Sequence, residues 1–238
     1  MDHHQSWYDY LPGYPGHSVN HIAAALLVLL VLGILSFTSY MRLKNIENCL
    51  VPSPKFSILN FFEVILEACM NLMRDIIGPD YKRHVPLIGT LTLFILFSNL
   101  MGLIPGFTPP TDTLNTTLAC GLVVFVYFNI QGLRVHGFGH ITHLANPIGE
   151  WWGWFLAPLL FPIEVISMTV RPFSLAIRLA GNMIGDHKVL FAFAGVMPFL
   201  LPLPFFALGL LVSVIQTAVF CILSCVYISL HTQETGSH

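Results

Sequence analysis

The chain has 238 residues, of which 55% are hydrophobic and only 9% are Asp, Glu, Lys or Arg. Ordinary soluble domains carry roughly 25% charged residues, so this composition excludes a water-soluble globular fold. The formal net charge of -2 also argues against a nucleic-acid partner.

The first predicted element is a membrane-spanning helix at residues 22–41. Positions 22–40 contain no Asp, Glu, Lys or Arg, and the segment is long enough to cross a bilayer core of about 30 Å. Residues 1–21 contain no Lys or Arg, whereas a cleaved signal peptide needs a basic region before its apolar stretch. We therefore expect the helix to remain in the mature protein, with residues 1–21 outside the membrane.

Residues 55–78 are predicted to form an amphipathic helix. Their polar side chains recur every three or four positions, at Asn60, Glu63, Glu67, Asn71 and Arg74, which places them on one stripe of an otherwise apolar helix. A spanning helix packed against others is the alternative, but so many charged groups in one crossing would be costly. We favour a helix that lies in the membrane interface.

Two predicted helical hairpins follow. In the spanning hairpin at 86–133, a short TPPTDT loop joins two apolar runs; the second hairpin covers 147–230 and breaks at 196–204, before a tail at 231–238. Its first helix runs without a loop signature from 159 to 193, which at 1.5 Å per residue is ~52 Å long. Such a helix exceeds a bilayer core of about 30 Å and must tilt by roughly 50–60° if it is unbroken. Pro172 is the expected point of any kink.

The basic residues predict the orientation of the chain, because Lys and Arg in short loops stay mainly in the cytoplasm. The N-terminus and the 106–113 and 196–204 loops have none. The N-terminus is therefore expected outside and the C-terminus in the cytoplasm, and residues 1–238 form a single all-α, polytopic membrane domain. The basic residues assigned to the inner side are Arg42, Lys44, Lys55, Arg74, Lys82, Arg83 and Arg134.

One face of the long tilted helix carries charge. Glu164, Arg171 and Arg178 are seven residues apart, and Ser167 and Ser174 repeat the same step; seven residues is nearly two helical turns, so they share one face. Charged groups at membrane depth usually line an ion or substrate path. For Arg171 an ion pair with Glu164 that only anchors the helix end is an equally weighted alternative.

Arg178 has no acid one turn away in its own helix. An arginine keeps its proton at physiological pH, so Arg178 cannot relay protons, but it can hold a carboxylate ionised and block a direct leak. Asp186 lies about two turns further out and Glu164 about four turns inward. The carboxylate must come from another subunit, which small residues such as Ser174 and Gly181 would allow to approach closely.

Several motifs together resemble subunit a of the F-type rotary ATP synthase. They are RPFSLAIRLAGNM with Glu164 upstream, NLMGLIP at 99–105, PTDTLNTT at 110–117 and VIQTAVF around Gln216. The resemblance implies the stationary half of a proton channel that faces a ring of c subunits, each of which offers one carboxylate. It also implies peripheral-stalk b subunits and membrane lipid as partners, indirect contact with the F1 ATPase sector, and a bacterial inner membrane or an energy-transducing organelle membrane. No cofactor is implied, and the chain is not expected to be an enzyme by itself.

The resemblance assigns roles along the chain. Arg178 matches the essential arginine, and Gln216 matches the glutamine that faces it from the last helix. Glu164, Ser167 and Ser174 match the cytoplasmic half-channel, and Asn182 and His187 match the outer one. Further candidates for the path are Arg171, Asp112 and Asn99.

The chain departs from the family at Gly209, where many relatives carry an ionisable residue paired across the hairpin with the position of His187. Asp186 is the expected substitute. From Arg178, Asp186 is turned by roughly 80° and His187 by roughly 180°, so Asp186 is expected to lean toward the ring and His187 toward the space behind the helix. We expect protons to enter by way of His187 and Asp186, with Asp112 and its loop as the alternative outer route.

Other functions remain as alternatives to this interpretation. A secondary transporter would be expected to show paired broken helices in two related halves, and these halves differ; a stand-alone ion channel is the other alternative. No metal site is predicted, because His136, His140 and His143 have no fourth ligand nearby. The five cysteines form no CxxC pair and are interpreted as packing residues.

Overall fold

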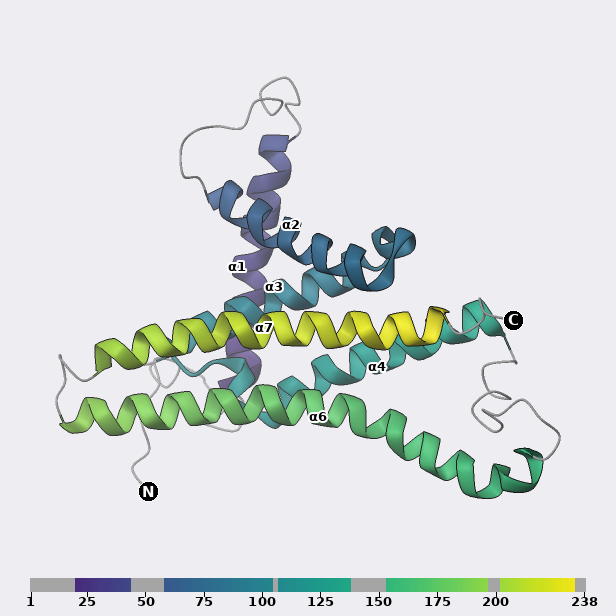
Figure 1. Ribbon diagram of the computed structural model, residues 1–238. Coiled ribbons are helices and arrows are strands. Elements are labelled where there is room, and N and C mark those ends of the chain that lie inside the picture. Colours follow the sequence, from purple (N-terminus) through teal and green to yellow (C-terminus); the bar gives the residue numbers. More distant parts are fainter. Residues whose placement is uncertain (1–19, 44–57, 105–106, 138–152, 197–201, 234–238) are drawn as a thin grey trace.

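A computed structural model describes residues 20–43, 58–104, 107–137, 153–196 and 202–233 (Figure 1). Within these ranges the chain forms α-helices and two short 3-10 helices, and it contains no strand. The predicted all-α fold class is confirmed. The elements are α1 (Asn20–Leu43), α2 (Ile58–Ile77), η4 (Pro79–Arg83), α3 (Val85–Met101), η5 (Pro110–Asp112), α4 (Leu114–His136), α6 (Gly153–Val196) and α7 (Pro202–Gln233).

Four helices of the described chain, α1, α4, α6 and α7, are long and apolar enough to cross a membrane. Helix α3 is apolar over its 17 residues and packs mainly against α7; its predicted pairing with α4 in a spanning hairpin stays a prediction. Many of the large apolar side chains on these helices are exposed, which suits flanks that face lipid. The chain is therefore a polytopic membrane protein.

Helices α6 and α7 lie side by side and run in opposite directions (Figure 1). Helix α6 has 44 residues and α7 has 32, which correspond to roughly 66 and 48 Å at 1.5 Å per residue. Helix α6 extends beyond the predicted 159–193 at both ends, and it continues through its internal prolines, Pro158, Pro162 and Pro172, with a bend in its N-terminal part that Figure 1 shows. Both lengths exceed a bilayer core of about 30 Å; the steep tilt that would accommodate them stays a prediction.

Helix α2 has one buried and one exposed face. Cys69, Met73 and Ile77 are buried, and their spacing of four residues places them on one stripe that packs against α7. The Ser229 hydroxyl of α7 donates a hydrogen bond of 3.1 Å to the carbonyl oxygen of Ile76. The opposite face exposes Glu63, Glu67, Asn71, Arg74 and Asp75, so the predicted amphipathic helix is present; its position at the membrane surface stays a prediction.

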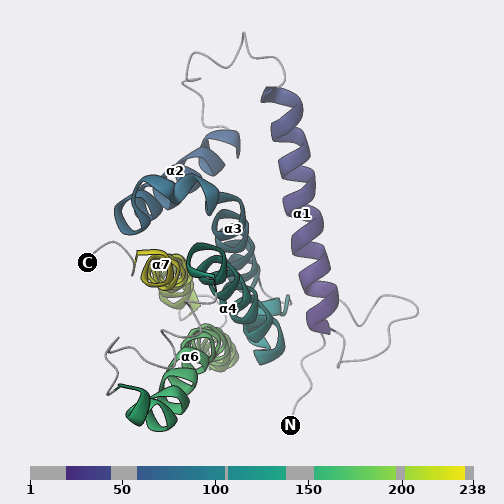
Figure 2. The same cartoon turned by 90° about the vertical axis from the view of Figure 1, so that its right-hand side faces the viewer.

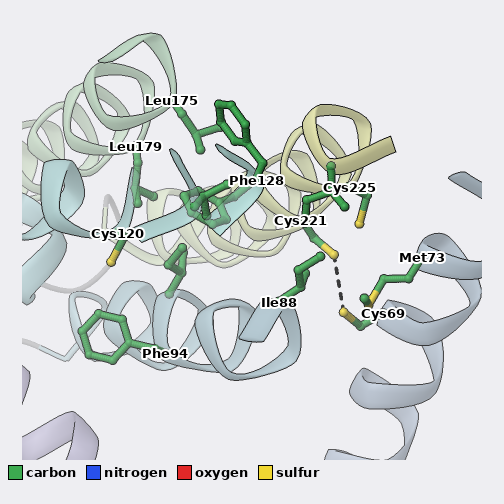
Figure 3. Close-up of a cluster of buried hydrophobic side chains, with 14 of the residues drawn as sticks. Cys69, Met73, Ile88, Phe94, Cys120, Phe128, Leu175, Leu179, Cys221 and Cys225 are labelled. Atoms are coloured by element: carbon green, nitrogen blue, oxygen red, sulfur yellow. Dashed lines mark hydrogen bonds between the residues drawn. The ribbon is translucent and has the colours of Figure 1, made fainter. Parts of the chain in front are cut away.

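The core lies where α3, α4, α6 and α7 meet, and α2 closes one side (Figure 3). Phe128 of α4 and Leu175 and Leu179 of α6 are at most 1% exposed. The sulfur atoms of Cys69 and Cys221 lie 3.4 Å apart, which joins α2 to α7. The described segments contain four cysteines, which are Cys69, Cys120, Cys221 and Cys225. All four are free and buried, as the packing interpretation predicted, and Cys49 lies outside those segments.

Gly121 allows α4 and α6 to approach closely. A Cβ atom at this position would lie 2.9 Å from the backbone carbonyl oxygen of Pro172, and that backbone cannot rotate away as a side chain could. We expect Gly121→Val to destabilise the protein by about 1–3 kcal/mol, the usual range for overpacking. Thermal unfolding in detergent measures the effect. Gly33→Val is the matched control, because a Cβ at Gly33 meets no atom within 4 Å; equal melting temperatures for the two variants would contradict the prediction.

Candidate functional site along α6 and α7

Arg178 lies on the exposed face of α6. It lines an open hollow of about 600 Å³ with Val170, Phe173, Ser174 and Ile177. Among the described residues no carboxylate oxygen lies within the 4.0 Å ion-pairing distance of its guanidinium group. An arginine on the apolar flank of a membrane helix is costly without a partner, so this hollow fits a surface that receives an acidic group from another molecule.

One turn beyond Arg178, a side-chain hydrogen bond joins α6 to α7. The Asn182 amide nitrogen donates to Gln216 Oε1 at 2.9 Å. Gln216 is 3% exposed, and its Nε2 atom is buried with no hydrogen-bond partner in the described segments. Because a buried amide donor without a partner is unfavourable, Gln216 is suited to donate to a water molecule or to a carboxylate that approaches Arg178.

His187 of α6 is buried against the end of α3 and against η5. Its Nε2 atom lies 2.7 Å from the carbonyl oxygen of Gly102, and its Nδ1 atom lies 3.8 Å from Asp112 Oδ2. A carbonyl oxygen can only accept a hydrogen bond, so Nε2 carries a proton. The Nδ1 atom, which faces the Asp112 carboxylate, is therefore the atom of His187 that can take up and release a second proton.

Asp186 faces a small cavity between α6 and α7. Its Oδ2 atom is buried and has no hydrogen-bond partner in the described part of the chain. The cavity has about 10 Å³, close to the minimum that one water molecule requires. A Cβ atom at Gly209 would lie 2.8 Å from Leu103 Cδ2, so Leu103 fills the space that a longer side chain at position 209 would need. Lining residues include Gly102, Leu103, Asp186, His187, Gly209 and Ser213.

Asn99 joins α3 to η5. It is fully buried in α3, and its Oδ1 atom accepts a hydrogen bond of 3.0 Å from the Thr111 hydroxyl. Thr111 belongs to η5, which also carries Asp112. Asn99 thus holds η5 against α3, which places Asp112 beside His187.

Toward the other end of α6, Glu164, Ser167 and Arg171 are all partly exposed. The ion pair between Glu164 and Arg171, one of the two equally weighted interpretations of Arg171, is absent among the described residues. The Arg171 guanidinium carbon instead lies 5.7 Å from the centre of the Tyr227 ring on α7, within the range of a cation–π contact. Arg171 therefore packs against the neighbouring helix, and the Glu164 carboxylate remains available for other contacts.

Sequence reasoning missed three partners at this site: the Gly102 carbonyl group, Thr111 and Tyr227. Gly102 and Thr111 lie inside the two short motifs at 99–105 and 110–117, so the motifs were a signal that these segments matter. No spacing in the sequence connects residue 102 or 112 with residue 187. The side chains of His136, His140 and His143, the tail from 234 onward, and residues 1–19 lie outside the described part of the chain.

The chain is similar to proteins of one family along most of its length. Residues 22–229 match the model of the family described as the ATP synthase A chain. The chain is 42% identical to ATP synthase subunit a of Sorangium cellulosum over 218 residues, which cover 91% of this chain and 84% of that protein. It is 44% identical to ATP synthase subunit a of Geobacter sulfurreducens over 213 residues, covering 90% and 87% of the two chains. With the protein of the same name from Bdellovibrio bacteriovorus the identity is 37% over 225 residues, or 94% and 96% of the two chains.

Proposed function

The chain belongs to the ATP synthase A chain family, and on this premise we propose that its two longest helices carry protons past Arg178. It is the stator subunit of the ATP synthase membrane sector that forms the proton channel. We assign no catalysis of ATP chemistry to the chain itself. Its contribution is two aqueous half-channels that end on opposite sides of Arg178.

The observation that carries the proposal is the exposed guanidinium group of Arg178, which faces outward from the apolar flank of α6 without a carboxylate of its own. A rotating ring of small c subunits would bring one carboxylate after another to this hollow. The fixed positive charge favours the ionised carboxylate, so the proton leaves as the carboxylate arrives. Because arginine does not release its own proton, the same charge blocks a proton from passing straight between the half-channels.

We assign the cytoplasmic half-channel to Glu164, Ser167 and Ser174. They follow Arg178 toward the start of α6 in steps of seven residues, and all three are at least partly exposed. Glu164 is the titratable member of the set, and its carboxylate has no ion pair in the described segments. It can therefore exchange protons with water from the cytoplasm.

Glu164→Gln is expected to slow proton exchange with the cytoplasm, because the amide keeps the size of the side chain but cannot bind a proton. A positioned proton-transfer group raises the rate of proton transfer by roughly 100-fold or more. Because water can bypass the site, the minimum expected loss of rate is smaller, about 10-fold. ATP-driven acidification of inverted vesicles, recorded across a range of cytoplasmic pH, measures the loss. Glu63→Gln, an exposed carboxylate of α2, is the control. A Glu164 variant equal to wild type at every pH would make this residue an anchor of the helix.

We assign the outer half-channel to Asp112, His187 and Asp186, with Asn182 and Gln216 next to Arg178. Protons from outside would reach the Asp112 carboxylate, move to His187 Nδ1 and continue to Asp186 on the same helix. The contact between Asp112 and His187 supports this order. The unpaired buried oxygen of Asp186 and the adjoining cavity support a water-assisted last step.

The proposed partners are the c-ring, the peripheral-stalk b subunits and, through them, the F1 sector. The proposed location is the bacterial inner membrane, with the N-terminus outside and the C-terminus in the cytoplasm, and with α2 on the cytoplasmic surface. Purification of the tagged chain in mild detergent is expected to recover a ring of very small hairpin subunits and a soluble ATPase. Recovery of the chain only as a lone oligomer would contradict these partners.

A further inference from the structure

A basic corner forms where η4 meets the end of α4. It consists of Lys82 and Arg83 of η4 and Arg134 of α4, all of which are exposed. The corner lies at the end of the α3–α4 hairpin, where α3 begins and α4 ends. In Figure 1 the end of α2 and the end of α4 lie on the same side of the molecule, and Figure 2 views the molecule from that side. Because α4 is long and apolar enough to cross a membrane and ends here, we expect the corner at a membrane boundary.

A hydrogen bond brings the two parts of the corner together. His84, which follows Arg83 directly, lies with Nδ1 2.9 Å from the Tyr127 hydroxyl of α4. Arg134 lies seven residues after Tyr127, which places it on the same face of α4 two turns closer to the helix end. The positive charges of Arg83 and Arg134 both act on the Tyr127 hydroxyl. Arg134 and the segment that holds Arg83 therefore lie on the same side of α4.

The His84 ring adds no fixed positive charge to this corner. Burial, followed by the nearby charge of Arg83, lowers the pKa of His84, so the ring is neutral near pH 7. The acidic groups close by are Asp80 of η4, which also interacts electrostatically with His84, and Asp75 at the end of α2. The balance at the corner remains positive, because Arg74 offsets Asp75 and the three basic residues exceed Asp80.

An apolar strip leads from the corner toward the middle of the membrane. Val123, Val126 and Ile130 of α4 are 46%, 52% and 45% exposed. Ile130 precedes Arg134 by four residues, so the strip and the arginine lie on the same face of the helix. The resulting surface is apolar along α4 and basic at its end. It therefore complements the apolar chains and the anionic headgroup of a phospholipid.

We propose that the corner formed by Lys82, Arg83 and Arg134, with the strip Val123, Val126 and Ile130, binds one anionic phospholipid. The guanidinium groups of Arg83 and Arg134 hold the phosphate, since arginine binds phosphate oxygens through paired N–H donors. The acyl chains lie along the strip of α4. Basic pockets between membrane helices are a recognised way to bind such headgroups, and the site is separate from the proposed proton path, so neither depends on the other.

Fluorescence quenching in the assembled ATP synthase tests the proposal. A dye on Ile130→Cys, in a chain without its native cysteines, reports the lipid next to the strip. Brominated phosphatidylglycerol is titrated into nanodiscs of phosphatidylcholine, and brominated phosphatidylcholine serves as the zwitterionic probe. We expect the dye to be quenched preferentially by phosphatidylglycerol.

Arg83→Gln/Arg134→Gln is expected to remove that preference. Each charge near a membrane surface contributes about five-fold to the binding of an anionic lipid, so the double change should weaken binding about 25-fold. Arg83→Lys/Arg134→Lys keeps the charge and should retain most of the preference, which separates a charge effect from misfolding. Lys188→Gln removes one exposed charge toward the C-terminal end of α6, outside the corner, and should leave the lipid preference unchanged.

Two results would overturn the proposal. The first is an unchanged preference for phosphatidylglycerol in the Arg83→Gln/Arg134→Gln variant. The second is displacement of the lipid by soluble glycerol phosphate at equal concentration, because that would make the site a receptor for free phosphate in which the apolar strip has no part.

Discussion

Replacement of Arg178 by alanine is expected to abolish ATP-driven proton pumping while the protein remains inserted in the membrane. The guanidinium group is the only charge of the described chain on the hollow formed by Val170, Phe173, Ser174 and Ile177. Without it, nothing favours release of a proton from the partner carboxylate that reaches α6. The hydrogen bond between Asn182 and Gln216 lies one turn away and does not replace the lost charge.

Inverted vesicles assayed for ATP-driven acidification measure this effect, and immunoblots of the membranes report the amount of inserted protein. Arg178→Lys is a second informative variant, because lysine keeps a positive charge but lacks the planar, permanently charged group of arginine; we expect strongly reduced pumping. Lys188→Ala is the matched control, since it also removes an exposed cation from α6 and should pump normally. Normal pumping by the alanine variant of Arg178 would overturn the proposed mechanism.

The second large effect is expected at the contact between Asp112 and His187. If protons enter through these two groups in series, Asp112→Asn and His187→Ala each slow proton flux from outside by roughly 100-fold, the lower end of what a positioned proton-transfer group contributes. The double variant should be little worse than the poorer single variant, because one interruption already closes a serial path. Asp186→Asn should behave in the same way, since Asp186 is proposed to follow His187.

Proton flux into vesicles, measured against external pH, distinguishes the routes. Asp80→Asn is the control, because Asp80 is an exposed carboxylate at the opposite end of the α3–α4 hairpin. Full loss in Asp186→Asn with normal flux in Asp112→Asn would show that the outer route avoids η5. Normal flux in the Asp186→Asn/His187→Ala double variant would exclude the relay of these two residues and leave Asp112 and its loop as the entry.

The positions of the helices could be predicted to within a few residues because their signals are local. An uninterrupted apolar run defined α1, and the periodic polar residues of 55–78 defined α2. Helix α6 is longer than the predicted 159–193, since it begins at Gly153 and ends at Val196. Proline is unfavourable inside a helix, yet α6 continues through Pro158 and Pro162.

Some features of the candidate site could likewise be predicted from local sequence signals, and others could not. Sequence alone singled out Arg178, because its charge in the middle of an apolar run is unusual at any tertiary arrangement, and the seven-residue spacing placed Glu164 and Ser174 on its face. Contacts between helices were decided only by the fold: the hydrogen bond of Asn182 with Gln216, the contact of Arg171 with Tyr227, and the placement of Asp112 beside His187. The physical reason is that helix periodicity fixes which residues of one helix share a face. The partner of that face depends on how separate helices pack, and 75 positions along the chain separate Asp112 from His187.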